Sequence, residues 1–130
     1  MNLGRKVILF LLFFPLFGVH FAFAETDSLT KLVFVTEEQF VKTGQISAEI
    51  MIQAQNANSE AEKVSETNDI EFKTTSSTGE FLNATGNPVT TTMSKNTSSR
   101  TFYYKDSSEG TYTLTVVIKG RKTEKSYVRT

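Results

Sequence analysis

Residues 98–118 read SSRTFYYKDSSEGTYTLTVVI, two alternating segments on either side of a polar turn. Successive side chains of an extended strand point to opposite faces, so Phe102 and Tyr104 share one face of the first segment. Four residues share one face of the second segment: Tyr112, Leu114, Val116 and Ile118. This alternation predicts two strands, each with one buried side and one side toward solvent.

Shorter segments of the same type occur along the rest of the chain. We expect further strands at 31–36, 46–55, 70–75, 79–83 and 89–93, and a last edge strand at 125–129. The stretch 56–69 has only Val64 as a sizeable apolar residue, so we expect an exposed loop there, with at most one helical turn. About seven short strands separated by polar turns predict an all-β fold, a β-sandwich.

The alternation also predicts which side chains enter the core. In the segment 46–55 the expected inward residues are Ile46, Ala48, Ile50, Ile52 and Ala54. In the segment 70–75 they are Ile70 and Phe72.

The first 24 residues have the pattern of a secretory signal peptide. Arg5 and Lys6 precede a 13-residue apolar run at 7–19, and Ala22-Phe23-Ala24 provides a small-x-small cleavage pattern. An uncleaved N-terminal anchor is the alternative. We expect a signal peptide at 1–24, a short lead at 25–30 and one sandwich domain at 31–130. No second apolar run follows, so no stable membrane span is expected after cleavage, and the protein is expected in the periplasm, at the cell surface or outside the cell.

Composition argues against most enzyme chemistry. The chain has no cysteine, and its one histidine, His20, lies in the expected signal peptide. We therefore expect no disulfide, no Ser-His-Asp or Cys-His catalytic set, no metal site and no cofactor. A paired-carboxylate glycosidase is the remaining enzymatic alternative, but it needs a deep cleft. Without Arg5 and Lys6, 12 basic residues face 14 acidic ones, and this balance predicts no nucleic-acid partner.

The turn 109–114, EGTYTL, resembles the corner at the start of strand F in immunoglobulin domains. In that comparison Gly110 supplies the tight turn, and the Tyr112 hydroxyl bonds back to the corner's backbone. Leu114 stands where the second cysteine would be, and Ile50 or Ile52 is its counterpart on the opposite sheet. An apolar pair thus takes the place of the disulfide.

The order of three motifs resembles bacterial immunoglobulin-like modules of the invasin and intimin type. These motifs are STGEF at 77–81, TFYYKD at 101–106 and EGTYTLTV at 109–116. The resemblance covers 31 to about 118 and implies a sandwich without a disulfide, a surface-protein context and no catalytic site. Such modules usually occur in tandem, whereas this sequence carries one.

Two groups of residues are candidates for surface contact. Alternation turns Tyr103 away from Phe102 and Tyr104, so its ring could stack on a sugar or anchor a partner; the alternative is a cross-strand aromatic pair. A basic group could contact an anionic polymer, or it could guard a sheet edge: Lys119, Arg121, Lys122 and Lys125. The acidic stretch 60–71 matches no calcium loop, and a solvated loop is favoured.

Together these observations predict an exported, non-enzymatic module that acts by surface contact in adhesion, envelope or extracellular assembly. Its partner would be a protein or a surface glycan, or a second copy joined through the edge strand at 125–129. Two alternatives stay open: a structural spacer without a specific ligand, and a carbohydrate-binding module that uses Tyr103.

Overall fold

The computed structural model describes residues 29–119, 121–123 and 126–130. The expected signal peptide at 1–24, the first part of the lead and Lys125 lie outside the described residues. In the part that is described there is no helix, so none is long and apolar enough to cross a membrane.

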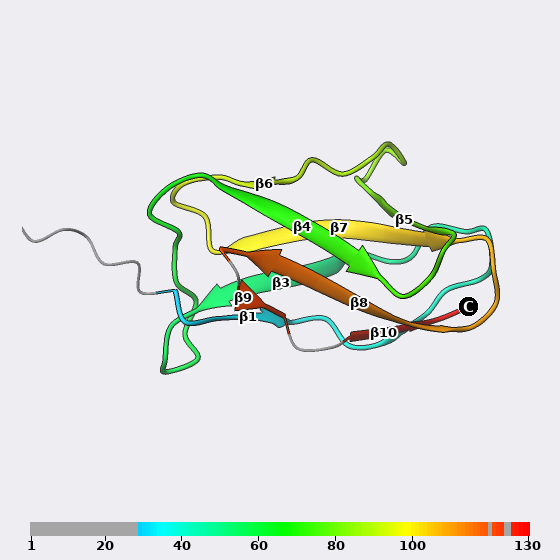
Figure 1. The fold of residues 1–130 in the computed structure, drawn as a ribbon, viewed down its shortest axis with the longest axis horizontal. Coiled ribbons are helices and arrows are strands. Elements are labelled where there is room, and N and C mark those ends of the chain that lie inside the picture. The colour runs from blue at the N-terminus through cyan, green and yellow to red at the C-terminus, as the bar shows by residue number, and fades with distance from the viewer. Residues whose placement is uncertain (1–28, 120, 124–125) are drawn as a thin grey trace, which may run out of the picture.

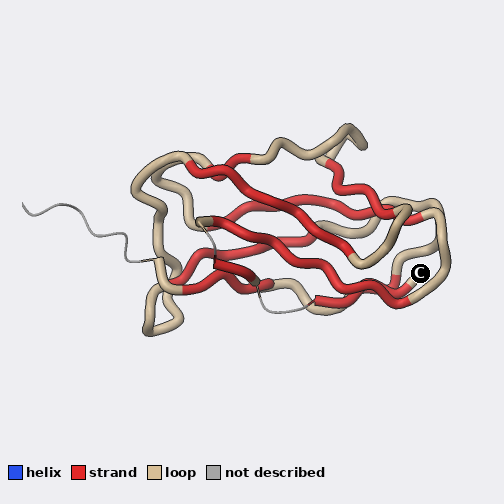
Figure 2. Tube along the Cα trace, in the orientation of Figure 1, coloured by secondary structure: helices blue, strands red, loops and turns tan. Residues whose placement is uncertain are grey.

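The described chain forms strands joined by loops and turns (Figure 2). Their bounds are β1 Lys31–Phe34, β2 Gln39–Phe40, β3 Ile50–Gln55, β4 Asn68–Thr74, β5 Gly79–Leu82, β6 Thr92–Met93, β7 Ser99–Asp106, β8 Thr111–Ile118, β9 Arg121–Lys122 and β10 Ser126–Arg129. Seven of these have four residues or more, and β2, β6 and β9 have two each. The prediction of an all-β chain with about seven strands is confirmed.

The strands make two sheets that pack face to face as a sandwich. One sheet has the order β1-β3-β7-β5, and the other has the order β2-β10-β8-β4-β6 with β9 paired to β8. Figure 1 shows β4 and β8 of the second sheet crossing over β7 and β3 of the first. The N-terminal segment contributes to both sheets, because β1 pairs antiparallel with β3 while β2 pairs parallel with β10.

Phe102 on β7 lies at the centre of the core and is fully buried. Its ring packs against Phe72 of the opposite sheet, with 5.0 Å between centroids, and against Phe81 at 5.7 Å. The inward residues of β8, Leu114, Val116 and Ile118, are fully buried as well. Edge-to-face aromatic pairs each add roughly 0.5–1.5 kcal/mol beyond area burial, so this cluster holds the sheets together without a disulfide.

The predicted inward face of 46–55 is correct from Ile50 onward and wrong before it. Ile46 and Ile50 are four residues apart in the sequence, but their partners on β7, Lys105 and Phe102, are only three residues apart. One extra residue is therefore inserted, as in a β-bulge, and it reverses the alternation. As a result Ile46 is 47% exposed, and Ser47 is buried instead.

The stretch between β3 and β4 is a loop, but it is anchored in the core rather than wholly exposed. Val64 is only 1% exposed and belongs to the hydrophobic core. Its amide donates to the carbonyl of Thr97, and its carbonyl accepts from the amide of Asn96, both at 2.9 Å. A single apolar side chain with two backbone hydrogen bonds is thus enough to dock the loop.

The last strand is not an edge strand, contrary to the prediction. β10 lies between β8 and β2, paired antiparallel with the first and parallel with the second. Val128 is buried in the core. The error arose because the parallel partner comes from residues 39 and 40, and local alternation says nothing about such a distant pairing.

Candidate functional site

The turn between β7 and β8 ends in a tyrosine that bonds back to the turn. The Tyr112 hydroxyl donates to the Glu109 carbonyl at 3.0 Å. A Cβ on Gly110 would lie 2.8 Å from that hydroxyl oxygen, so the ring packs where only glycine fits. The C-terminal residue joins the same corner, since the amide of Thr130 donates to the Gly110 carbonyl at 2.9 Å. The corner therefore ties β8 to the end of β10.

A buried polar cluster lies next to this corner, and sequence reasoning missed it. Tyr104 and Asp106 are both fully buried on β7. The Tyr104 hydroxyl donates to one oxygen of the Asp106 carboxylate at 2.6 Å, and the Thr78 hydroxyl donates to the other at 2.5 Å. The amide of Ser108 also donates to Asp106 at 3.1 Å. The signal in the sequence that could have found it is the alternation of side chains along β7, which puts Asp106 on the same face as Phe102 and Tyr104.

This cluster connects the two sheets. The Thr74 hydroxyl on β4 lies 2.9 Å from the Tyr104 hydroxyl on β7. The Tyr104 side chain also packs closely against Gly79, where an added Cβ would be 2.1 Å from the hydroxyl oxygen. Any side chain at position 79 would therefore clash with the Tyr104 phenol.

Burial and hydrogen bonding shift both ionisable groups of the cluster. Burial, together with the neighbouring Asp106 carboxylate, raises the pKa of Tyr104 to about 12. Burial also acts to raise the pKa of Asp106, but hydrogen bonds from Ser76, Thr78, Tyr104 and the Ser108 amide outweigh it and hold the pKa below its ordinary 3.8. At neutral pH the pair is therefore a neutral phenol beside a carboxylate. That is an arrangement for stability, because neither group reaches solvent.

Tyr103 lies on the outer face of the first sheet, opposite Leu82 of β5. It is half-buried, and its hydroxyl is directed at the exposed Glu49 carboxylate, 3.5 Å away. The ring is therefore accessible in part, and a ligand that stacked on it would also meet Glu49.

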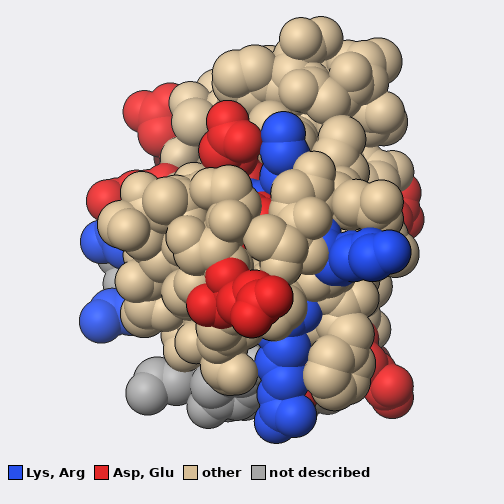
Figure 3. Space-filling model, turned by 90° about the vertical axis from the view of Figure 1, so that its right-hand side faces the viewer, with Lys and Arg blue, Asp and Glu red and all other residues tan. Residues whose placement is uncertain are grey.

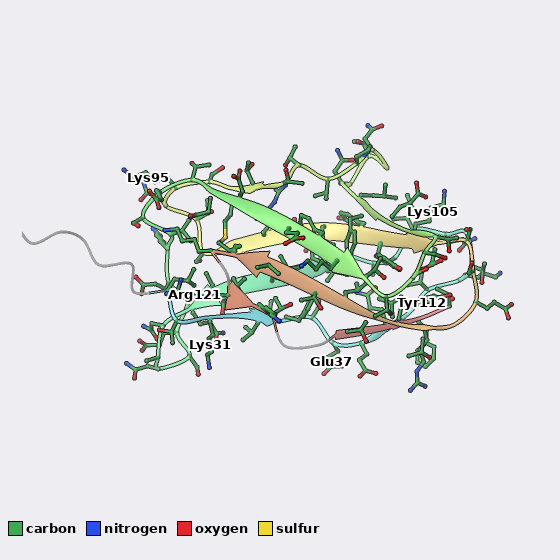
Figure 4. The ribbon with its side chains drawn as sticks, in the orientation of Figure 1. Lys31, Glu37, Lys95, Lys105, Tyr112 and Arg121 are labelled. Carbon is green, nitrogen blue, oxygen red and sulfur yellow. The ribbon has the colours of Figure 1, made fainter. Side chains whose placement is uncertain are left out.

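The structure brings three of the four basic candidates to the β8–β9 hairpin. Arg121 pairs with Ile118 and Lys122 with Val117, while Lys119 occupies the turn between the strands and bonds Glu66 at 2.7 Å. Figure 4 shows Arg121 at the same end of the molecule as Lys31 and Lys95. Lys125 lies outside the described residues.

The acidic stretch does not converge on a common point. Glu66 pairs with Lys119, and Glu71 lies 3.2 Å from Lys73. Within the ranges that the structure describes, no group of three or more His, Cys, Asp or Glu residues could hold a metal ion. Figure 3 shows acidic and basic side chains interspersed on one end of the sandwich, with no continuous patch of one sign.

Comparison with solved structures places this arrangement among known folds. A two-domain fragment of the surface-layer protein SbsC, domains 4 and 5, matches over 80% of this chain with a TM-score of 0.57 and 15% identity. A β-glycosidase from Bacteroides vulgatus matches over 82% of this chain with a TM-score of 0.53 and 18% identity. The D0-D1 fragment of intimin matches over 81% at a TM-score of 0.49 and 14% identity.

The chain has an immunoglobulin-like β-sandwich fold. This confirms the resemblance to bacterial immunoglobulin-like modules as a likeness of fold. The chain spans 53% of the SbsC fragment, 49% of the intimin fragment and 14% of the β-glycosidase, so it corresponds to one part of each. No protein-family model matches the sequence, and no curated protein matches it.

Proposed function

We propose that this chain is a non-catalytic immunoglobulin-like module of an exported surface protein and that it works by contact. The observation that carries the proposal is the match of 80% of the chain to domains of a surface-layer protein. Such domains occur in a protein of the cell envelope, which supports an extracellular or envelope location for this chain. Adhesion and assembly are the contact roles that suit a rigid sandwich.

The chemistry of the described residues supports the same proposal. In the part of the chain that the structure describes, Tyr104 and Asp106 form a buried ionisable cluster in which neither residue is exposed to solvent. General acid–base catalysis needs a group within reach of a bound substrate. The glycosidase neighbour does not alter this, because the aligned part is 14% of that enzyme.

Retention by cell envelopes tests the contact role. The product secreted after expression of the full chain would be incubated with washed envelopes from the native host, then sedimented. We expect saturable retention above that of an unrelated protein of similar charge. Retention no greater than that control would contradict a contact role and favour the structural spacer.

Two variants separate the kinds of contact in the same assay. Tyr103→Ala removes the ring on the outer face of the first sheet, and Lys122→Glu reverses an exposed charge on the β8–β9 hairpin. Loss of retention in Tyr103→Ala alone, with an unchanged melting temperature, would identify a glycan-type stacking contact. Loss in Lys122→Glu alone, together with retention of the unaltered protein that weakens as salt is raised, would identify an anionic polymer.

A further inference from the structure

The two sheets have four edges, and the chain itself covers two of them. Thr123 lies beside β1 and bridges to Leu32 in parallel. The segment after β5 folds back along it, with the amide of Val89 bonded to the Phe81 carbonyl at 3.1 Å. Among the described residues, the edges of the second sheet that no other strand pairs with are β6 and β2. An open edge presents unpaired backbone groups to another strand.

The edge strand β2 differs from β6 in carrying an exposed aromatic side chain. Phe40 is 81% exposed, the highest value among the large hydrophobic residues exposed in the described chain. Val35, at 45%, lies in the same segment where the chain crosses from one sheet to the other. The residues around β6, 90–92, are exposed threonines. Apolar surface on an open edge is a feature of strand-pairing sites.

The backbone of Phe40 is oriented for pairing with another strand. The amide of Val41 donates to the Arg129 carbonyl of β10 at 2.7 Å, so Val41 faces inward along the sheet. Neighbouring residues of a strand direct their amide and carbonyl to opposite sides, so those of Phe40 point away from β10. An antiparallel strand centred on Phe40 could then exchange two hydrogen bonds with it.

The charged residues that flank Phe40 would face residues of opposite charge if two copies of the strand paired about a two-fold axis. Glu38 and Lys42 are both exposed and lie two residues before and after Phe40. Antiparallel pairing about Phe40 sets Glu38 of one copy opposite Lys42 of the other, twice by symmetry. Arg129 lies over the Phe40 ring, 5.5 Å from its centroid, so each ring has a cation on the side away from the partner.

We propose that two copies of this module join through antiparallel pairing of their β2 strands, centred on Phe40. A foreign strand would also find the open edge, but the symmetric placement of Glu38 and Lys42 favours a second copy. The inference adds a specific partner to the proposed contact role and rests on it. It replaces the expectation that 125–129 would mediate self-association, since that strand is already paired on both sides.

Charge exchange between the two positions tests this pairing. Sedimentation velocity over a wide concentration range would compare four secreted proteins: the unaltered chain, Glu38→Lys, Lys42→Glu and the double variant. We expect a dimer for the unaltered chain, at least about tenfold weaker association for each single variant, and recovery in the double variant. The two single variants mixed should form a heterodimer, because each then meets the opposite charge.

Melting temperatures of the four proteins, measured at a concentration where all are monomeric, control for folding, and they should agree because both side chains are exposed. A monomer at all concentrations would overturn the proposal, and so would a dimer that the single variants leave unchanged. Either result is separate from envelope retention, since a monomer can still bind an envelope. A protein that dimerises but is retained by envelopes no better than the unrelated control would contradict the contact role instead.

Discussion

Asp106 is a carboxylate in the core whose hydrogen-bond donors are hydroxyl groups and a backbone amide, with no cation among the contacts that the structure gives it. Removing a charge from water costs several kcal/mol unless hydrogen bonds replace the lost hydration. Tyr104 and Thr78 supply them from two different elements, so the carboxylate fixes β7 against the turn that precedes β5. This cluster stabilises the end of the sandwich where the chain turns into β8.

Replacing Tyr104 with phenylalanine should cost about 1–3 kcal/mol of unfolding free energy at neutral pH, because Asp106 and Thr74 lose a partner. Urea denaturation measures this cost. Tyr103→Phe is the matched control: its hydroxyl makes only a long contact with an exposed carboxylate, and the change should cost less than about 0.5 kcal/mol. Equal costs for the two variants would contradict the role given to Tyr104.

Acid should weaken the fold through Asp106. Its folded-state pKa lies below the ordinary 3.8, so the folded protein binds this proton less tightly than the unfolded chain does. The stabilisation is therefore complete above about pH 4 and is lost as pH falls through the folded pKa. We expect Asp106→Asn, measured by urea denaturation from pH 2 to 7, to be less stable at neutral pH and flatter below pH 4. If the free energy of unfolding falls equally steeply with acid in both proteins, the loss of stability comes from other carboxylates.

Alkali should weaken the fold through Tyr104. Burial raises its pKa from 10.0 to about 12, so stability is complete below pH 10 and is lost as pH rises to 12. A shift of about two pKa units corresponds to about 3 kcal/mol. Urea midpoints from pH 9 to 12 should show this loss, and Tyr104→Phe should lack it. Absorbance of tyrosinate in the folded protein should show a titration near pH 12 that Tyr104→Phe lacks.

At the scale of the elements, the extra residue before β3 decides which side chains reach the core. Ile50 is buried opposite Phe102, while Ile46 is exposed beside Lys105. We expect Ile50→Ala to cost about 2–5 kcal/mol and Ile46→Ala less than about 1 kcal/mol, measured by chemical denaturation. Continuous alternation from 46 to 55 would make both changes severe, so similar large costs would refute the bulge.

Periodicity predicted the strands that alternate without interruption, and it failed where pairing depends on distant residues. The burial of Phe102, Leu114 and Val116 follows from side-chain parity alone. The inversion before Ile50 depends on the register with β7, and the interior position of β10 depends on β2 crossing between sheets. Neither leaves a local signal. Asp106 was missed because parity puts it inside while its charge suggests the surface.

For the whole molecule, the sheets are closed by contacts between the ends of the described chain. β2 and β10 pair in parallel, and Thr130 bonds the tyrosine corner at Gly110. Removing the last strand would therefore expose the core around Val128 instead of freeing an edge. A sandwich closed in this way is a self-contained unit, which suits a module that is joined to others or displayed on a surface.

The central claim, that this unit is exported and acts outside the cytoplasm, is tested most directly in the native host. A C-terminally tagged full chain would be followed through cell fractionation, and the recovered protein would be sequenced from its N-terminus. The account predicts a product that begins near Glu25 in the envelope or extracellular fraction, folded and resistant to protease. A cytoplasmic product that retains residues 1–24 would contradict it.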